Sequence, residues 1–103
     1  MTDLTQQEWA SQFSEDNNAI VLDVRTSEEY EEGHIPNAVN NDIYGGQAFI
    51  DNLLPMDKAK NYYVYCRSGK RSAQACQIMK GLGYTNTYNL LGGILEWEGA
   101  IVE

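Results

Sequence analysis

The sequence predicts an α/β fold built on a parallel sheet, and two observations predict it. Its strand candidates are short, continuous apolar runs such as Ala19–Val24, which are typical of strands buried on both faces. These runs alternate along the chain with segments of helical character, as expected when helices join the strands of a parallel sheet. The length of 103 residues, without repeats or linker-like stretches, predicts one domain spanning residues 1–103.

Two capping-box sequences predict helix starts in the first half of the chain. Thr5–Glu8 and Thr26–Glu29 each place threonine at the N-cap and glutamate three residues later. Apolar runs and glycine breaks predict the remaining elements. In order, we expect a helix from Thr5 to about Phe13, a strand at Ala19–Val24, a short helix from Thr26 that Gly33 ends, a weak strand at Ala38–Asn40 and a helix around Ala48–Leu54.

The second half of the chain continues the alternation. Tyr62–Tyr65 predicts a strand that ends at Cys66, and the apolar residues of 71–82 fall on one helical face. Thr85–Leu91 predicts the next strand. The glycine pair at 92–93 then precedes a last helix that contains Leu95 and Trp97.

Charge and composition exclude several kinds of partner. The net charge of −8, from 7 basic and 15 acidic residues, disfavours nucleic acid and anionic membranes. No apolar run could span a bilayer, and the N-terminus lacks the pattern of a secretory signal. Two cysteines do not predict a disulfide framework. We therefore expect a cytoplasmic protein that binds neither nucleic acid nor membrane.

The basic residues concentrate beside one cysteine. Arg67, Lys70 and Arg71 supply three of the seven positive charges within one five-residue stretch directly after Cys66, which predicts a local anion site. The stretch lies between a predicted strand and a helix, at the carboxyl edge of the sheet, where parallel α/β folds bind ligands. The candidate loop consists of Cys66, Arg67, Ser68, Gly69, Lys70, Arg71 and Ser72.

A loop of this kind stabilises a cysteine thiolate. Its backbone N–H groups point inward where it winds into a helix, and the helix dipole adds positive potential. An unperturbed thiol with a pKa of about 8.5 is mostly protonated at pH 7, whereas a decrease of about 2 units makes it mostly thiolate. Gly69 suits a tight loop because it tolerates positive φ. The alternative is that Cys66 is a small buried core residue, but the cationic loop favours a reactive cysteine.

Three segments, in this order and spacing, resemble the signatures of the rhodanese family over nearly the whole chain. They are Leu22–Arg25 with Glu29-Tyr30 and Gly33–Ala38, the loop Cys66–Arg71, and Leu91–Gly93 with Trp97. Asn37 stands where glycine is common in the family. The resemblance implies about five parallel strands flanked by helices on both faces, and a sulfurtransferase that uses no cofactor.

The resemblance also implies roles for the loop residues. Cys66 would attack the outer sulfur of a donor such as thiosulfate, and a thiol or cyanide would then remove that sulfur from the resulting persulfide. The N–H groups of 67–72 would hold the negative charge of the persulfide. Arg67 would attract the anionic donor and Lys70 would assist from the rim. Arg71 either secures the loop or meets the anion, and the sequence leaves both roles open.

An acidic and a basic residue at a strand end are expected to support the loop. Asp23 and Arg25 follow the first long strand, and Glu29 lies one helical turn beyond. The resemblance implies an internal salt-bridge set that braces the active-site loop. An ordinary surface pair, worth about 0–1 kcal/mol, is an equally weighted alternative.

Other functions remain as alternatives. The chain could be a carrier or adaptor module that accepts sulfur from one protein of a sulfur relay and passes it to another, or a silent interaction domain. A cysteine phosphatase or arsenate reductase is disfavoured. Phosphatases place five residues between cysteine and arginine, whereas four separate Cys66 from Arg71 and the arginine position is Ser72.

Two further residues with reactive side chains are expected to be structural. Cys76 could resolve a persulfide into a disulfide, but its neighbours Ala75 and Met79 favour a core position. His34, the single histidine, has no spacing to other ligand types that resembles a metal site, so a hydrogen bond in the turn at 33–36 is expected and no metal ion.

Overall fold

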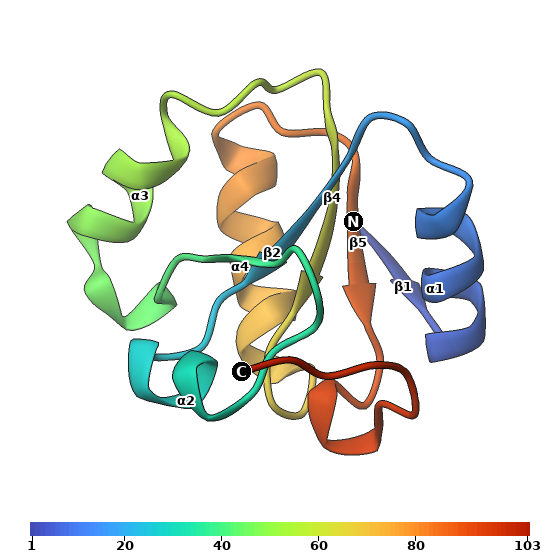
Figure 1. The fold of residues 1–103 in the computed structure, drawn as a ribbon. Coiled ribbons are helices and arrows are strands. Elements are labelled where there is room, and N and C mark those ends of the chain that lie inside the picture. The colour runs from blue at the N-terminus through green and yellow to red at the C-terminus, as the bar shows by residue number, and fades with distance from the viewer.

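The computed structural model describes residues 1–103 and is organised around a five-stranded sheet. All the paired strands are parallel, and their order is β1-β5-β4-β2-β3. Figure 1 shows the arrows of β4 and β5 pointing toward the same end of the molecule. This sheet confirms the predicted fold class. The strands are β1 (Thr2–Leu4), β2 (Ala19–Asp23), β3 (Val39–Asn40), β4 (Asn61–Tyr65) and β5 (Thr87–Leu90).

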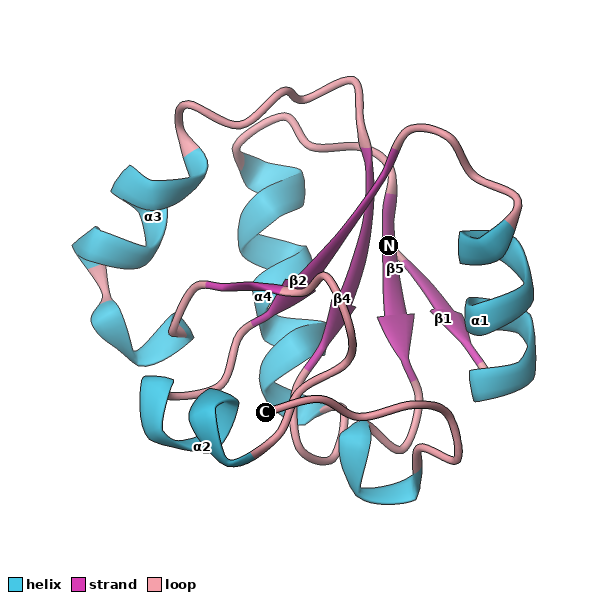
Figure 2. Cartoon of the chain, viewed as in Figure 1, coloured by secondary structure: helices cyan, strands magenta, loops and turns pink.

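Helices cover both faces of the sheet. Apolar side chains of α3 and α4 pack on one face, and those of α1 pack on the other. The short helix α2 lies at the end toward which the strands point, close to the C-terminal segment (Figure 2). The helices are α1 (Gln6–Ser14), α2 (Ser27–Glu32), α3 (Gln47–Leu53) and α4 (Lys70–Gly81), with 3₁₀ turns η1 (Ile43–Gly45) and η2 (Ile94–Glu96).

The central strand β4 distributes its side chains between two cores. Successive side chains of a strand point to opposite faces. Tyr62, Val64 and Cys66 accordingly pack toward α3 and α4, while Tyr63 and Tyr65 pack toward α1. All five are completely buried. The alternation aims the side chain of Cys66 at the face that α4 covers.

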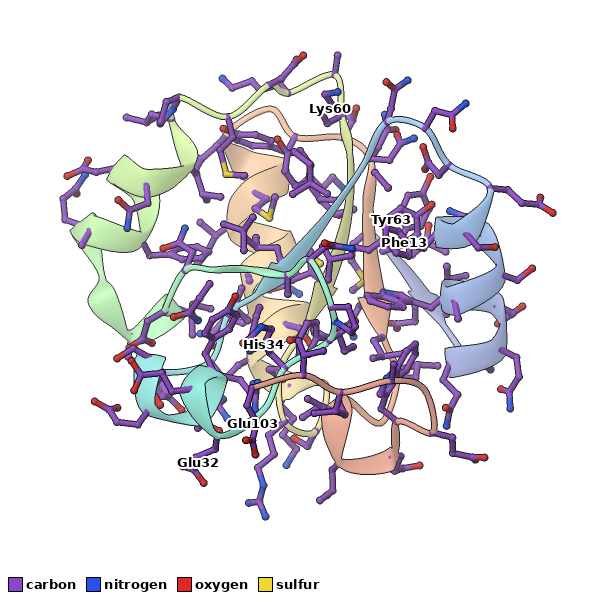
Figure 3. The ribbon with its side chains drawn as sticks, in the orientation of Figure 1. Phe13, Glu32, His34, Lys60, Tyr63 and Glu103 are labelled. Carbon is purple, nitrogen blue, oxygen red and sulfur yellow. The ribbon has the colours of Figure 1, made fainter.

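An aromatic cluster attaches α1 and the C-terminal segment to the second face. The fully buried indole of Trp9 meets the rings of Tyr63, Tyr65 and Trp97 edge-on, at centroid distances of 5.7, 6.3 and 5.5 Å. Phe13 lies beside Tyr63 at 5.6 Å (Figure 3). Edge-to-face contacts of this kind add to the stabilisation from burial.

The prediction from the sequence differs from the structure at both ends of the chain. The edge strand β1, which pairs in register with Tyr88–Leu90, was not predicted because Thr2–Leu4 contains a single apolar residue. The predicted last helix is only the 3₁₀ turn η2, and Trp97 after it is already extended, with φ −68° and ψ 127°. The other predicted elements occur within about two residues of their expected bounds.

Both predicted capping boxes form, at Thr5 and Thr26. Asn37 has a φ of 69°, in the left-handed region that asparagine tolerates better than most residues, so the turn does not require the glycine that is common there. None of the helices has the length and apolar character that a bilayer-spanning segment requires.

We expect the Trp9→Ala variant to lose about 3–5 kcal/mol of unfolding free energy, because the truncation removes a fully buried aromatic side chain from the cluster. Urea unfolding followed by circular dichroism would measure this loss. Gln7→Ala, at an exposed position of the same helix, is the control and should change the free energy by less than about 0.5 kcal/mol. Equal effects of the two substitutions would contradict the role of the cluster.

Candidate active site

Cys66 directly follows β4, and the loop after it winds into the N-terminus of α4. The backbone N–H of Gly69 donates to Cys66 Sγ at 3.1 Å, and Ser72 Oγ lies 3.4 Å from the same sulfur. The first N–H groups of an α-helix have no partner within the helix, so they are available to an anion. The predicted arrangement of donors around the sulfur is therefore present.

The conformation of Gly69 makes the tight loop possible. Its φ is +102°, which a residue with a side chain rarely adopts, so the requirement predicted for this glycine is confirmed. No side chain caps α4 at this position. The sulfur of Cys66 therefore occupies the place of a capping acceptor.

The two cysteines have opposite pKa shifts, for identifiable reasons. Burial alone would raise the pKa of Cys66, but hydrogen bonds from the Ser72 hydroxyl and from backbone N–H groups of the loop outweigh burial and lower it. The pKa of Cys76 is raised to about 11, chiefly by burial. Cys76 lies in the apolar core, as expected. Of the two thiols, Cys66 is therefore the one that ionises more readily.

The sulfur lies beneath the surface, while the loop side chains above it are exposed. Cys66 has no accessible surface in this structure, whereas Arg67, Ser68 and Lys70 are exposed. The sulfur itself is therefore not exposed to solvent in this structure. Beside the loop is an open pocket of about 270 Å³ lined by Arg25, Glu29, Glu32, Gly33, Arg67, Ile94 and Leu95.

Arg71 secures the loop through an ion pair. Its guanidinium donates to both carboxylate oxygens of Glu29, at 2.7 and 2.9 Å, and lies 5.4 Å from the centroid of the exposed Tyr44 ring. Glu29 is also the third residue of α2 and the partner of the N-cap Thr26 in its capping box, where it accepts a hydrogen bond from the Thr26 N–H. Of the two roles left open for Arg71, the structure supports securing the loop.

Asp23 and Arg25 form a buried pair rather than a surface pair. Arg25 Nη2 donates to Asp23 Oδ2 at 2.7 Å and to the Gly33 carbonyl at 2.8 Å. The Tyr65 hydroxyl donates to the same Asp23 oxygen at 2.7 Å. The expected set of three charged residues is thus two separate pairs, since Glu29 binds Arg71 and not Arg25.

The C-terminal turn supports the loop in a way that the sequence reading did not anticipate. Ile94 N–H donates to the Cys66 carbonyl and Leu95 N–H to the Arg67 carbonyl, each at 3.0 Å. A Cβ atom on Gly93 would lie 2.3 Å from the Arg67 carbonyl oxygen, so only glycine allows this approach. In the sequence, the glycine pair at 92–93 was a feature that could have indicated this close backbone approach.

Asn89 also contacts the loop, a role that was not predicted from the sequence. It is 2% exposed in β5, behind the loop, and bonds to Ser72, Gly69 and Asp3. An asparagine within a predicted strand was a signal for such a role, because a buried amide needs hydrogen-bond partners.

His34 has a structural role. Its Nδ1 lies 2.9 Å from the Tyr30 carbonyl oxygen, and the imidazole stacks on the Tyr30 ring at a centroid distance of 3.7 Å. The expected hydrogen bond in this turn is therefore present. No group of three or more histidine, cysteine, aspartate or glutamate side chains is arranged to hold a metal ion.

Comparison with known proteins adds a family match to this geometry. The family model of the rhodanese-like domain matches residues 6–100. The chain is 39% identical over 84 residues to "Putative sulfurtransferase YtwF" of Bacillus subtilis (strain 168), which covers 82% of this chain and 78% of that protein. A crystal structure of a rhodanese-like domain protein from Staphylococcus aureus has a TM-score of 0.80 and 32% identity, covering 96% of this chain and 95% of that one.

A longer relative shares this unit. The "tRNA uridine(34) hydroxylase" of Legionella pneumophila (strain Corby) is 39% identical over 106 residues, which covers 99% of this chain and 41% of the relative. The chain therefore spans about two fifths of the length of that protein.

The ion pair of Glu29 predicts a pH-dependent stability. Hydrogen bonds from Arg71 are the main cause that lowers the pKa of Glu29 from 4.5 to about 2. A lowered folded-state pKa stabilises the fold above the unfolded value, and this stabilisation is lost as pH falls from about 4.5 to about 2. Because the pair is partly exposed, we expect Glu29→Gln, which keeps the capping box, to lose only about 1 kcal/mol at pH 7.

Urea unfolding at a series of pH values would measure this difference. Wild type and Glu29→Gln should converge as pH falls through the stated window. Glu28→Gln, at the exposed neighbouring position without an ion pair, is the matched control and should follow wild type throughout. A Glu29→Gln difference that stays constant down to pH 2 would argue against the charge as its cause.

Proposed function

This chain belongs to the rhodanese-like domain family, and from that membership we propose that residues 1–103 act as a single-domain sulfurtransferase with Cys66 as its nucleophile. One observation supports this most directly. The Gly69 N–H donates to Cys66 Sγ at 3.1 Å, at the start of a helix whose N–H groups face the sulfur. A site of this kind stabilises a sulfur anion before and after the sulfur is transferred.

In the first half-reaction, the Cys66 thiolate attacks the outer sulfur of thiosulfate or of another persulfide donor. A new S–S bond forms between Sγ and that sulfur. The S–S bond of thiosulfate breaks, and sulfite leaves with the electron pair. The terminal sulfur of the persulfide carries one negative charge, and the N–H groups of the loop 67–72 hold it, in the manner of an oxyanion hole.

In the second half-reaction, an acceptor removes the outer sulfur. Cyanide or a thiolate attacks the terminal sulfur, a bond to that sulfur forms, and the S–S bond to Cys66 breaks. The electron pair returns to Sγ, so the thiolate is regenerated and no external oxidant or reductant is needed. Neither half-reaction requires a general base when Cys66 attacks as the thiolate.

Arg67 and Lys70 are the residues we assign to attraction of the anionic donor. Both are exposed residues of the loop and have no ion pair or side-chain hydrogen bond, so their charges are available. Arg67 also lines the pocket next to the loop. In a chain with a net charge of −8, these two cations create a local positive potential that attracts a dianion such as thiosulfate.

A second candidate function is transfer of sulfur between proteins. Leu95, 64% exposed, lies with Arg67 in the lining of the same pocket, so the pocket combines an exposed apolar side chain with a cation. Surfaces of that composition suit a protein partner. Efficient turnover of thiosulfate and cyanide favours the enzyme, whereas efficient transfer only from a protein persulfide favours the carrier.

Phosphatase chemistry has less support. Arg71 directly precedes the sequence position of the phosphate-binding arginine in phosphatases. Its guanidinium is paired with Glu29 of α2. The position where phosphatases have arginine is Ser72, which is fully buried behind the sulfur. The hydroxylase relatives contribute to the proposal only through the segment they share with this chain, 41% of the length of the Legionella protein.

We expect wild type to gain the mass of one sulfur atom on incubation with thiosulfate, and to lose it again on addition of cyanide. Cys66→Ser should gain nothing, because an alcohol does not form a persulfide, and Cys76→Ser should behave as wild type. Intact-mass spectrometry measures all three. Hydrolysis of an aryl phosphate without sulfur uptake would overturn the proposal.

We expect Arg67→Ala to raise KM for thiosulfate about tenfold with little change in kcat, the effect of losing one charged contact of about 1.4 kcal/mol. The variant should also depend less on ionic strength, because steering of an anion by an exposed charge is screened by salt. Lys80→Ala, an exposed cation at the far end of α4, is the control. An unchanged KM with an unchanged salt dependence would refute the role of Arg67.

A further inference from the structure

The buried amide of Asn89 has a single consistent orientation. Its nitrogen lies 2.9 Å from Asp3 Oδ1 and 3.3 Å from the Gly69 carbonyl oxygen, and both of these oxygens can only accept hydrogen bonds. The amide nitrogen must therefore face them, which leaves the amide oxygen facing Ser72. That oxygen lies 2.5 Å from Ser72 Oγ, so the hydroxyl of Ser72 donates its proton to Asn89.

Ser72 has only one proton, and two groups face its oxygen. Besides Asn89, Cys66 Sγ lies 3.4 Å from Ser72 Oγ. While Cys66 is a thiol, the S–H can point at a lone pair of Ser72 and the hydroxyl can stay on Asn89. When the thiol proton leaves to solvent, the sulfur can no longer donate a hydrogen bond and can only accept them. The Ser72 hydroxyl can donate to this anion only by turning away from Asn89.

We propose that Asn89 is a positioning residue that holds the Ser72 hydroxyl while the sulfur of Cys66 is neutral and competes with the sulfur anion for that hydroxyl. The inference rests on the proposed role of Cys66 as the nucleophile and assigns a residue that sets its reactivity. When the hydroxyl turns to the sulfur, the Asn89 oxygen is left buried without a donor, which is unfavourable. Asn89 therefore opposes ionisation, while the N–H groups of the loop favour it.

This opposition has a use in sulfur transfer. The nucleophilicity of a thiolate decreases as its pKa decreases, so a sulfur anion that is stabilised too strongly reacts slowly. A competing acceptor moderates the stabilisation without removing any N–H donor. The charged and titratable groups around Cys66 are Arg67 directly after it, Lys70, Arg71 and Cys76 on α4, and Asp3 on β1 behind Asn89. None of them contacts the Ser72 hydroxyl, so Asn89 can act independently of them.

The rate of alkylation of Cys66 by iodoacetamide, measured against pH, tests the proposal without any sulfur donor. Trypsin separates the two cysteines, because peptide 61–67 carries Cys66 and peptide 72–80 carries Cys76, so mass spectrometry reports Cys66 alone. We expect Asn89→Leu to shift the midpoint of the Cys66 profile downward by about 0.5–1 pH unit, the effect of freeing one hydrogen bond for the anion.

A double-mutant cycle distinguishes this competition from a purely structural role. In the Ser72→Ala background, where the hydroxyl is absent, Asn89→Leu should leave the midpoint unchanged. Thr87→Val, which removes a buried hydroxyl from the same strand, is the matched control and should retain the wild-type midpoint. Asn89→Ala serves as a second variant where circular dichroism shows that Asn89→Leu does not fold.

The opposite results would overturn the proposal. If Asn89 only braces the loop, its substitution displaces the N–H groups from the sulfur and the midpoint rises. An unchanged midpoint, or an equal shift in the Ser72→Ala background, would also exclude competition for the hydroxyl. Sulfur uptake from thiosulfate is measured separately, so failure of the proposed function appears as absent uptake whatever the alkylation profile shows.

Discussion

Backbone N–H groups at the start of α4 face the sulfur of Cys66, and the rest of the site depends on this contact. A sulfur anion below the surface lacks water, so it persists only where directed donors replace its hydration. The left-handed conformation of Gly69 turns its N–H toward the sulfur at 3.1 Å. Cys76, buried on the same helix among apolar residues, has its pKa raised. The difference between the two cysteines is therefore a difference in donors and not in burial.

Three separate parts of the chain hold these donors in place. The Glu29–Arg71 ion pair connects α2 to the first turn of α4. The C-terminal turn donates two backbone hydrogen bonds to the carbonyls of Cys66 and Arg67. From β5, Asn89 bonds to the Gly69 carbonyl. Donors fixed in advance stabilise a developing charge without reorganising when it appears, which is the property that sulfur transfer requires.

The buried pair of Asp23 and Arg25 supports the neighbouring strand end. Removing two charges from water is costly, and their attraction offsets that cost only when further hydrogen bonds satisfy both groups. Here the Tyr65 hydroxyl bonds to Asp23, and the Gly33 carbonyl accepts from Arg25. The pair thus connects three parts of the fold: β2, β4 and the turn after α2.

The sequence by itself determined the parallel α/β class, the two capping boxes and the cysteine loop at a helix start, because each of these signals lies within a few neighbouring residues. Only the tertiary structure decided that Thr2–Leu4 is an edge strand, that Arg71 binds Glu29, and that Asn89 meets Ser72. These contacts join residues far apart in the chain. Which of them meet is set by the order of strands in the sheet, and no local pattern encodes that order.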